Sequence, residues 1–175
     1  MSNYRALEEK IQSILGAPRR PVAISFTNAV PGGVARFEGS EPSSCSFWPI
    51  AADGRTFYTV ASNHFNCPIG GYTHNALTEE RMPELQQVLT LMGDIGYIRM
   101  EEVPGVFHMQ EPAQVIVYSP LGDAPLEPTV VLAAGKPARV MMLAEAATRA
   151  GAMSSLPLLG RPPAWPFQPR WPAAP

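Results

Sequence analysis

Apolar residues recur at helical spacing in three segments of the chain, at 4–15, 78–91 and 137–149. Asn3 stands where a helix is often capped, and Gly16 follows the first segment where a helix often ends. We therefore predict three helices over these ranges. The positions that we expect to face inward are Leu7, Ile11, Ile14 and Leu15 in the first, Met82, Leu85, Val88, Leu89 and Met92 in the second, and Val140, Leu143 and Ala147 in the third.

Short runs of β-branched and aromatic residues, bounded by proline, glycine or asparagine, predict strands between these helices. The runs lie at 21–26, 56–61, 103–109, 114–118 and 129–134. Ser43 or Ser44 is placed to cap a short helical turn that carries Cys45. Strands interleaved with helices are typical of an α/β or α+β domain. We predict a single domain built on one mixed sheet flanked by helices.

The C-terminal stretch has a different character. Residues 161–175 contain six prolines and two of the three tryptophans without any periodicity, so they cannot form a regular element. The stretch is either an extended tail lying on a surface or the product of a shifted reading frame in a GC-rich gene. We predict one α/β domain over 1–160 and an irregular Pro/Trp-rich tail over 161–175.

The composition is that of a compact globular protein, with 46% hydrophobic and 16% charged residues in a chain of 175. A net charge of −2 gives no reason to expect a nucleic acid or an anionic membrane as a partner. No run approaches the roughly 18 apolar residues of a membrane span, and no leader precedes the first helix. We expect a cytoplasmic location, where the two cysteines are free thiols or ligands rather than a disulfide framework.

The candidate chemistry gathers in residues 63–74, which read NHFNCPIGGYTH. This segment holds Cys67, one of the two cysteines, and two of the three histidines. Pro68 suits the first position of a helix, so Cys67 is expected at a helix N-terminus, where unpaired N–H groups favour the thiolate. A thiolate is a metal ligand or a nucleophile, whereas the structural alternative is a buried cysteine that packs as a small hydrophobe.

His64 precedes Cys67 by three residues and His74 follows it by seven, so a helix would place all three on one face. Together with Cys45, they form a mixed sulfur and nitrogen set of the kind that binds zinc or iron. The structural alternatives are a surface position for His74 and a helix-capping role for His64.

Cys67 and Pro68 also match the short Cys-Pro element found where a thiolate binds ferric haem. In that case His108, Met100 or Met109 is a candidate second axial ligand, with core packing as the alternative for both methionines.

Two readings without iron remain open. A thiol-dependent enzyme would use Cys67 with His64 or His74 as its base and the amides of Gly70 and Gly71 as its oxyanion site, although no carboxylate is placed to orient either histidine. A regulatory domain would instead bind a small molecule or anion between Gly70-Gly71 and the helix N-terminus, with Cys67 as packing.

Several of these motifs resemble the domain of unknown function 169 family of bacteria and archaea. The resemblance covers about residues 4–161, and it implies a cytosolic α/β domain with a cysteine-centred site but names no reaction. Its motifs are Pro21-Val22-Ala23-Ile24, Cys45, Asn63-His64-x-x-Cys67-Pro68-x-Gly70-Gly71-Tyr72, Glu127-Pro128-x-Val130-Val131 and Gly135-x-Pro137-Ala138.

Members of that family typically continue past the position of Arg161 with a further cysteine in a glycine-rich half-motif. Here the Pro/Trp-rich stretch replaces it, so a three-cysteine cluster would have only Cys45 and Cys67 from this chain. A histidine, an exogenous ligand or a second subunit of a homodimer would have to complete such a site.

We predict a metal-cofactor-binding protein with a redox or sensing role. In an iron–sulfur version Cys67 and Cys45 are the ligands, with His64 next and His74 available, and Gly70 and Gly71 lie beside the cofactor. In a haem version Cys67 alone binds the iron, and zinc is the third possibility.

Overall fold

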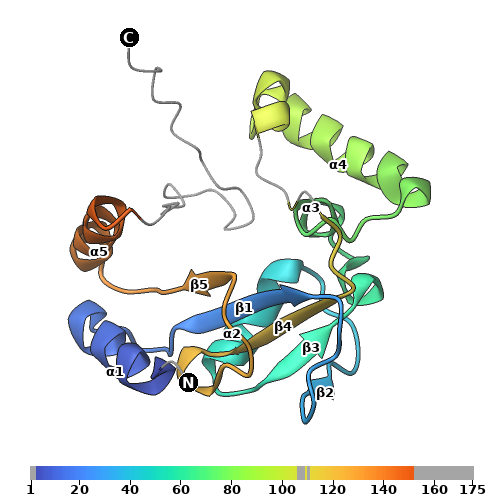
Figure 1. Ribbon diagram of the computed structural model, residues 1–175. Coiled ribbons are helices and arrows are strands. Elements are labelled where there is room, and N and C mark those ends of the chain that lie inside the picture. Colours follow the sequence, from blue (N-terminus) through green and yellow to red (C-terminus); the bar gives the residue numbers. More distant parts are fainter. Residues whose placement is uncertain (1–2, 106–108, 110, 152–175) are drawn as a thin grey trace.

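A five-stranded sheet lies at the centre of the protein (Figure 1). The structure is a computed structural model, and it describes residues 3–105, 109 and 111–151. The strand order is β2-β3-β4-β1-β5, with β2 and β3 parallel and the other neighbours antiparallel. The strands are β1 (Val22–Thr27), β2 (Ala35–Arg36), β3 (Phe57–Thr59), β4 (Val115–Pro120) and β5 (Val130–Leu132). The prediction of a single α/β domain with one mixed sheet is confirmed.

The two central strands carry the longest pairing, from Val22 opposite Pro120 to Thr27 opposite Val115. All six residues of β4 are buried, which explains its uninterrupted run of apolar residues after Gln114. The short helix α2 (Phe47–Ala52) packs over one face of these strands. The resulting core consists of Val22, Ile24, Phe37, Phe47, Ala51, Ala52, Phe57, Ile116 and Tyr118.

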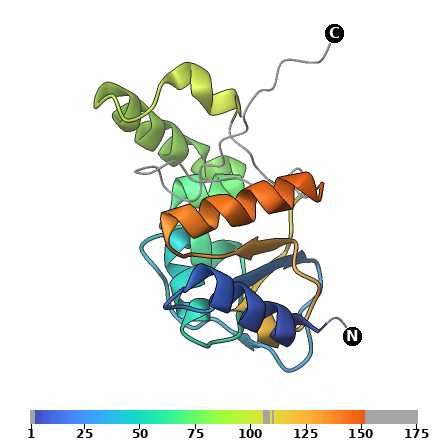
Figure 2. The ribbon, with the colours of Figure 1, turned by 90° about the vertical axis from the view of Figure 1, so that its left-hand side faces the viewer.

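The longer helices stand at opposite ends of the sheet (Figures 1 and 2). Helices α1 (Tyr4–Leu15) and α5 (Pro137–Arg149) lie beside β5, where the Arg139 guanidinium donates to the Ile14 carbonyl at 2.9 Å. Helices α3 (Pro68–Thr73) and α4 (Met82–Asp94) pack against each other at the other end. Among the described residues, no helix has the length and apolar character needed to cross a membrane.

The inward face of α1 differs from the prediction. Leu15 is fully buried as expected, but Leu7 and Ile14 are 44% and 47% exposed, whereas Glu8 is only 5% exposed. The Glu8 carboxylate accepts a hydrogen bond from the Gly122 amide at 2.6 Å and forms an ion pair with Arg20, also at 2.6 Å. Helix α1 is therefore oriented about its axis so that the Glu8 carboxylate, rather than the Leu7 side chain, lies against the 3₁₀ helix η5 (Leu121–Asp123).

Three further predictions differ from the structure or lie outside the described residues. The strand predicted over 103–109 is wrong at its start, because Met100–Gly105 forms the 3₁₀ helix η4, in which Pro104 has no N–H to donate to a sheet. Residues 106–108, which include His108, lie outside the described residues, as does the predicted tail over 161–175. The helix predicted from residue 78 begins as the 3₁₀ helix η3 (Glu79–Arg81) and continues as α4.

Candidate functional site

The turn that carries Cys45 packs directly against the helix that begins at Cys67. This turn is the 3₁₀ helix η1 (Ser44–Ser46), capped by the Ser43 side chain as the sequence predicts. A Cβ atom on Gly70 would overlap the Ser44 Oγ and would lie 2.5 Å from the Ser44 Cβ. The absence of a side chain at Gly70 is therefore what lets α3 approach η1 so closely.

Cys67 caps the N-terminus of α3 with its sulfur. The Sγ atom accepts a hydrogen bond from the Gly70 amide at 3.3 Å and one from the Ser43 hydroxyl at 3.8 Å. Ser43 also accepts from the Cys45 amide at 3.2 Å, so one serine links the segments of both cysteines. Within the part of the chain that the structure describes, neither cysteine forms a disulfide, and both are half-buried. Two donors therefore hold the Cys67 sulfur in position at the start of α3.

His64 is buried with both ring nitrogens hydrogen-bonded. Its Nδ1 lies 2.8 Å from the Ser44 Oγ and its Nε2 lies 2.9 Å from the Thr59 Oγ1. Because the Thr59 hydroxyl donates to the Ile116 carbonyl, it accepts from Nε2–H, and the Ser44 hydroxyl donates to Nδ1. Burial, and secondarily the nearby His74, lower the pKa of His64 to about 3, so the ring is neutral. Metal binding by His64 would require the loss of one of these bonds.

His74 has the tautomer that a metal ligand needs. Its Nδ1 lies 2.7 Å from the Gly70 carbonyl and donates to it, which leaves the lone pair on Nε2. The ring stacks on Phe26 at a centroid distance of 5.7 Å and lies 5.2 Å from the His64 ring. Burial lowers the pKa of His74, and the bond to Gly70 opposes that shift.

Cys45 is the central residue of η1, which is followed directly by α2. It acts electrostatically on Tyr118, and burial followed by this interaction raises the pKa of Tyr118. The Tyr118 hydroxyl is buried and has no hydrogen-bond partner among the described residues, and its ring lies 5.5 Å from that of Phe47. Tyr118 could not be recognised from the sequence, because it stands inside an apolar strand.

The predicted ligands do not all converge. His64 ends the 3₁₀ helix η2 (Ala61–His64), whereas Cys67 caps α3, so no single helix places them on one face as the spacing suggested. Within residues 3–105, 109 and 111–151, no group of three His, Cys, Asp or Glu side chains is placed to hold a metal ion. Of the candidate axial methionines, Met100 is 43% exposed beside α4, and the Met109 amide donates to the Thr73 carbonyl.

The sequence analysis missed two hydroxyl residues of this site. Thr59 holds His64 from β3, and Ser43 holds Cys67 from the preceding turn. Ser43 was visible only as a helix cap, and Thr59 only as a strand residue.

A comparison with family models matches residues 10–154 to the family DUF169, described as uncharacterised ArCR. The chain belongs to the DUF169 family. No curated protein and no solved structure matches it. The DUF169 match contains all five strands of the sheet and both cysteines, so the site around Cys67 lies wholly inside the family region.

Because His64 is buried in its neutral form, we expect the free energy of unfolding of this DUF169 protein to fall in acid. The unfolded chain binds a proton on His64 near its ordinary pKa of 6.5, whereas the folded protein does so only near 3, so stability falls as the pH falls through this interval. We expect a loss of about 2 kcal/mol from His64 between pH 7.5 and pH 5, at about 1.4 kcal/mol per pH unit below 6.5. His74 contributes in the same direction.

Urea unfolding at pH 7.5, 6 and 5 measures this effect. The variant His64→Gln retains an amide but no titrating ring, and it should show a smaller loss over the same interval. Equal losses in the variant and the wild type would contradict the assignment to His64.

Proposed function

We propose that this protein binds an iron-containing cofactor through the thiolate of Cys67. The observation that carries the proposal is the pair of hydrogen bonds that the Cys67 Sγ accepts from the Gly70 amide and the Ser43 hydroxyl. Donors to a metal-bound thiolate hold its orientation and tune the reduction potential of the metal. Cys67 is half-buried, so part of the residue remains accessible.

Each residue around Cys67 would have a distinct role in holding such a cofactor. Cys67 would supply the thiolate, and Ser43 and Gly70 would hold it by their hydrogen bonds. Cys45, whose amide is bonded to the same Ser43, would be a second thiolate in a cluster and a structural residue beside haem. Of the histidines, His74 has the available Nε2 lone pair. The bound iron would supply electron transfer or the sensing of a small ligand.

The number of cysteine ligands that one chain supplies determines whether a second subunit is needed to complete the site. With only two cysteines in the chain, the remaining ligands would come from the cofactor itself, as in haem, or from a second subunit. A homodimer in the reducing cytoplasm suits a cluster, and light scattering with and without iron would test it. A monomeric mass that persists with bound iron would leave the cofactor proposal standing without the dimer.

The test is an absorption spectrum with metal analysis on protein purified without oxygen, for the wild type and the variant Cys67→Ala. We expect a Soret band, or the broad visible absorption of an iron–sulfur cluster, that disappears in the variant. Cys45→Ala is the matched control, since it leaves a haem spectrum unchanged and removes that of a cluster. Circular dichroism of each variant shows whether the fold is intact.

Two outcomes would overturn the proposal. Colourless protein with about one zinc per chain would replace the iron site by a zinc site. Colourless protein without metal would leave the thiol-dependent enzyme and the anion-binding domain as the candidates. Selective labelling of Cys67 by iodoacetamide near neutral pH would then favour the enzyme.

A further inference from the structure

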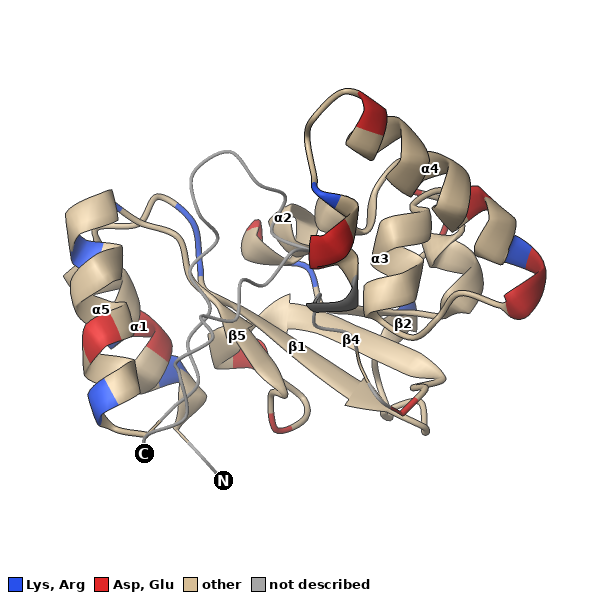
Figure 3. Cartoon of the chain, turned by 90° about the horizontal axis from the view of Figure 1, so that it is seen from above, with Lys and Arg blue, Asp and Glu red and all other residues tan. Residues whose placement is uncertain are grey.

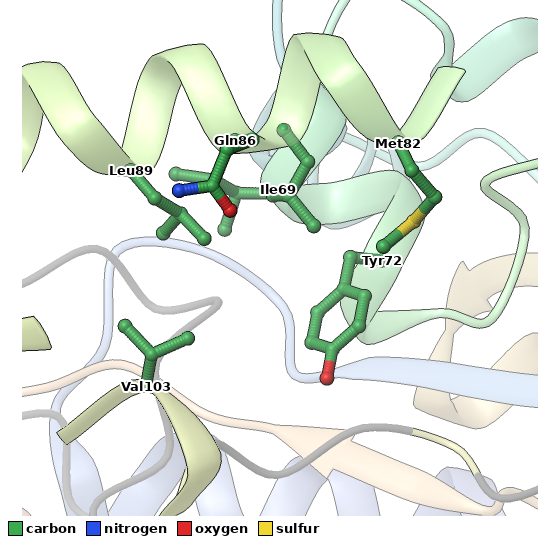
Figure 4. Close-up of a pocket in the computed structure, with 7 residues that line it drawn as sticks. Ile69, Tyr72, Met82, Gln86, Leu89 and Val103 are labelled. Carbon is green, nitrogen blue, oxygen red and sulfur yellow. The ribbon is translucent and has the colours of Figure 1, made fainter. Parts of the chain in front are cut away.

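A pocket of about 190 Å³ lies between α3 and α4, on the side of α3 that faces away from η1 (Figure 4). Leu85 and Leu89 of α4, which are 4% and 7% exposed, form a continuous apolar wall with Ile69. Val103 of η4 points toward Leu89 from across the pocket in Figure 4. Tyr72, Met82 and Gln86 complete the lining.

We propose that this pocket binds a neutral monocyclic aromatic molecule with one hydrogen-bonding substituent. An apolar cavity of about 150 Å³ is large enough for benzene. The volume of about 190 Å³ therefore accommodates one ring and a small substituent, and it is too small for a drug-sized ligand of several rings.

The side-chain amide of Gln86 indicates which polar substituent the ligand carries. Gln86 is the lining residue with an amide, and it lies beside Ile69 and Leu89 in Figure 4. Its side-chain amide donates a long hydrogen bond, 3.5 Å to the Thr90 hydroxyl, and exchanging so long a bond for one to a ligand has little cost. An amide both donates and accepts, which matches a hydroxyl group.

The net negative charge of residues 79–102, which contribute most of the pocket lining, favours a neutral ligand over an anionic one. The segment 79–102 carries six carboxylates against two arginines, and Figure 3 shows acidic residues at both ends of α4. A ligand carboxylate or phosphate in this pocket would meet a negative field. The carboxylates are Glu79, Glu80, Glu84, Asp94, Glu101 and Glu102, and the arginines are Arg81 and Arg99.

This inference goes beyond the proposed function and does not depend on it. Ile69 and Tyr72 stand on the same helix that Cys67 caps, but the pocket is formed without either cysteine. Loss of Cys67 should therefore leave binding unchanged, which separates failure of the pocket from failure of the iron site.

The test is a titration of the full chain, labelled at its Ile, Leu, Val and Met methyl groups, followed by NMR. The probes are phenol, toluene and benzoate. We expect phenol to shift the methyl groups of Ile69, Leu85 and Leu89 in a saturable way, with a dissociation constant on the order of 1 mM. Benzoate should cause no saturable shift at those groups over the same range.

Two pairs of variants locate the ligand. Leu89→Phe fills the pocket and should abolish saturable phenol binding, whereas Leu91→Phe, at a position 60% exposed, should retain it. Gln86→Leu should weaken phenol about fivefold, the effect of one hydrogen bond, and leave toluene unchanged. Gln87→Leu is the exposed control and should alter neither.

Three results would overturn the proposal. The first is a wild-type phenol titration without saturation. The second is saturable binding that persists in Leu89→Phe, or in Val103→Phe, which fills the same space from the opposite wall if Leu89→Phe does not fold. The third is benzoate binding as tight as that of phenol, which would contradict the selection by charge.

Discussion

Replacing Gly70 with alanine lowers the free energy of unfolding by about 3 kcal/mol and disrupts the Cys67 site. The new Cβ would lie 2.5 Å from the Ser44 Cβ, an atom that no rotation of the Ser44 side chain moves away. Alanine favours a helix by about 1 kcal/mol over glycine, but overpacking costs about 1–3 kcal/mol. Separation of α3 from η1 also weakens the Ser44 bond to buried His64, at a further cost of about 1–3 kcal/mol. The cost of the collision and of the weakened hydrogen bond therefore exceeds the stabilisation that alanine gives to the helix.

Urea unfolding of Gly70→Ala and Gly32→Ala measures this difference. Gly32 is the matched control, because a Cβ there has nothing within 4 Å and its φ lies outside the left-handed region. It should change the stability by less than about 0.5 kcal/mol. The double variant Ser44→Gly/Gly70→Ala should be less unstable than the sum of the two single variants, since it removes the collision. A Gly70→Ala protein as stable as the wild type would refute the close packing of α3 on η1.

The variant Glu8→Gln should lose about 2–3 kcal/mol of stability. The Glu8 carboxylate is buried, and it accepts from the Gly122 amide and from Arg20, each at 2.6 Å. Glutamine has nearly the same volume, but it removes the charge and directs an NH₂ group at one of these two donors. Breaking a fully buried pair costs about 3–5 kcal/mol, and the loss here should lie at or just below the bottom of that range because Arg20 is partly exposed and keeps its ion pair with Asp123 at 2.8 Å.

Glu9→Gln is the control for Glu8→Gln, because Glu9 is the next residue of the same helix and is exposed. Its stability should lie within about 0.5 kcal/mol of the wild type. Thermal or urea unfolding at neutral pH compares the three proteins. If both variants unfold at the wild-type midpoint, the Glu8 interaction does not stabilise the docking of α1.

Local signals in the sequence located most of the secondary structure. Gly16 ends α1 in the left-handed conformation at a φ of 58°, and Ser43 caps η1, both as their residue types predict. Pro68 begins α3 with Cys67 as its cap. These features depend on atoms within about four residues, so a single sequence specifies them. The sequence also identified the segment 63–74, although the cofactor it would hold remains a prediction.

Long-range contacts decided what local patterns did not contain. The spacing of apolar residues in α1 predicted Leu7 inward, but the helix buries Glu8 because Gly122, 114 residues away, offers it an unpaired amide. His64 looked like a ligand by its spacing from Cys67, but Ser44 and Thr59 occupy both of its nitrogens.

The sequence by itself determined where most helices and strands form, where the caps of α1, η1 and α3 lie, and which segment carries the sulfur and imidazole groups. Only the tertiary structure decided how α1 is rotated, that Gly70 lies against Ser44, and which ring nitrogen of each histidine is available. The physical reason is that propensity and capping act within one turn of the chain. Burial and hydrogen-bond partners instead depend on pairing between β1, β3 and β4, which are far apart in sequence.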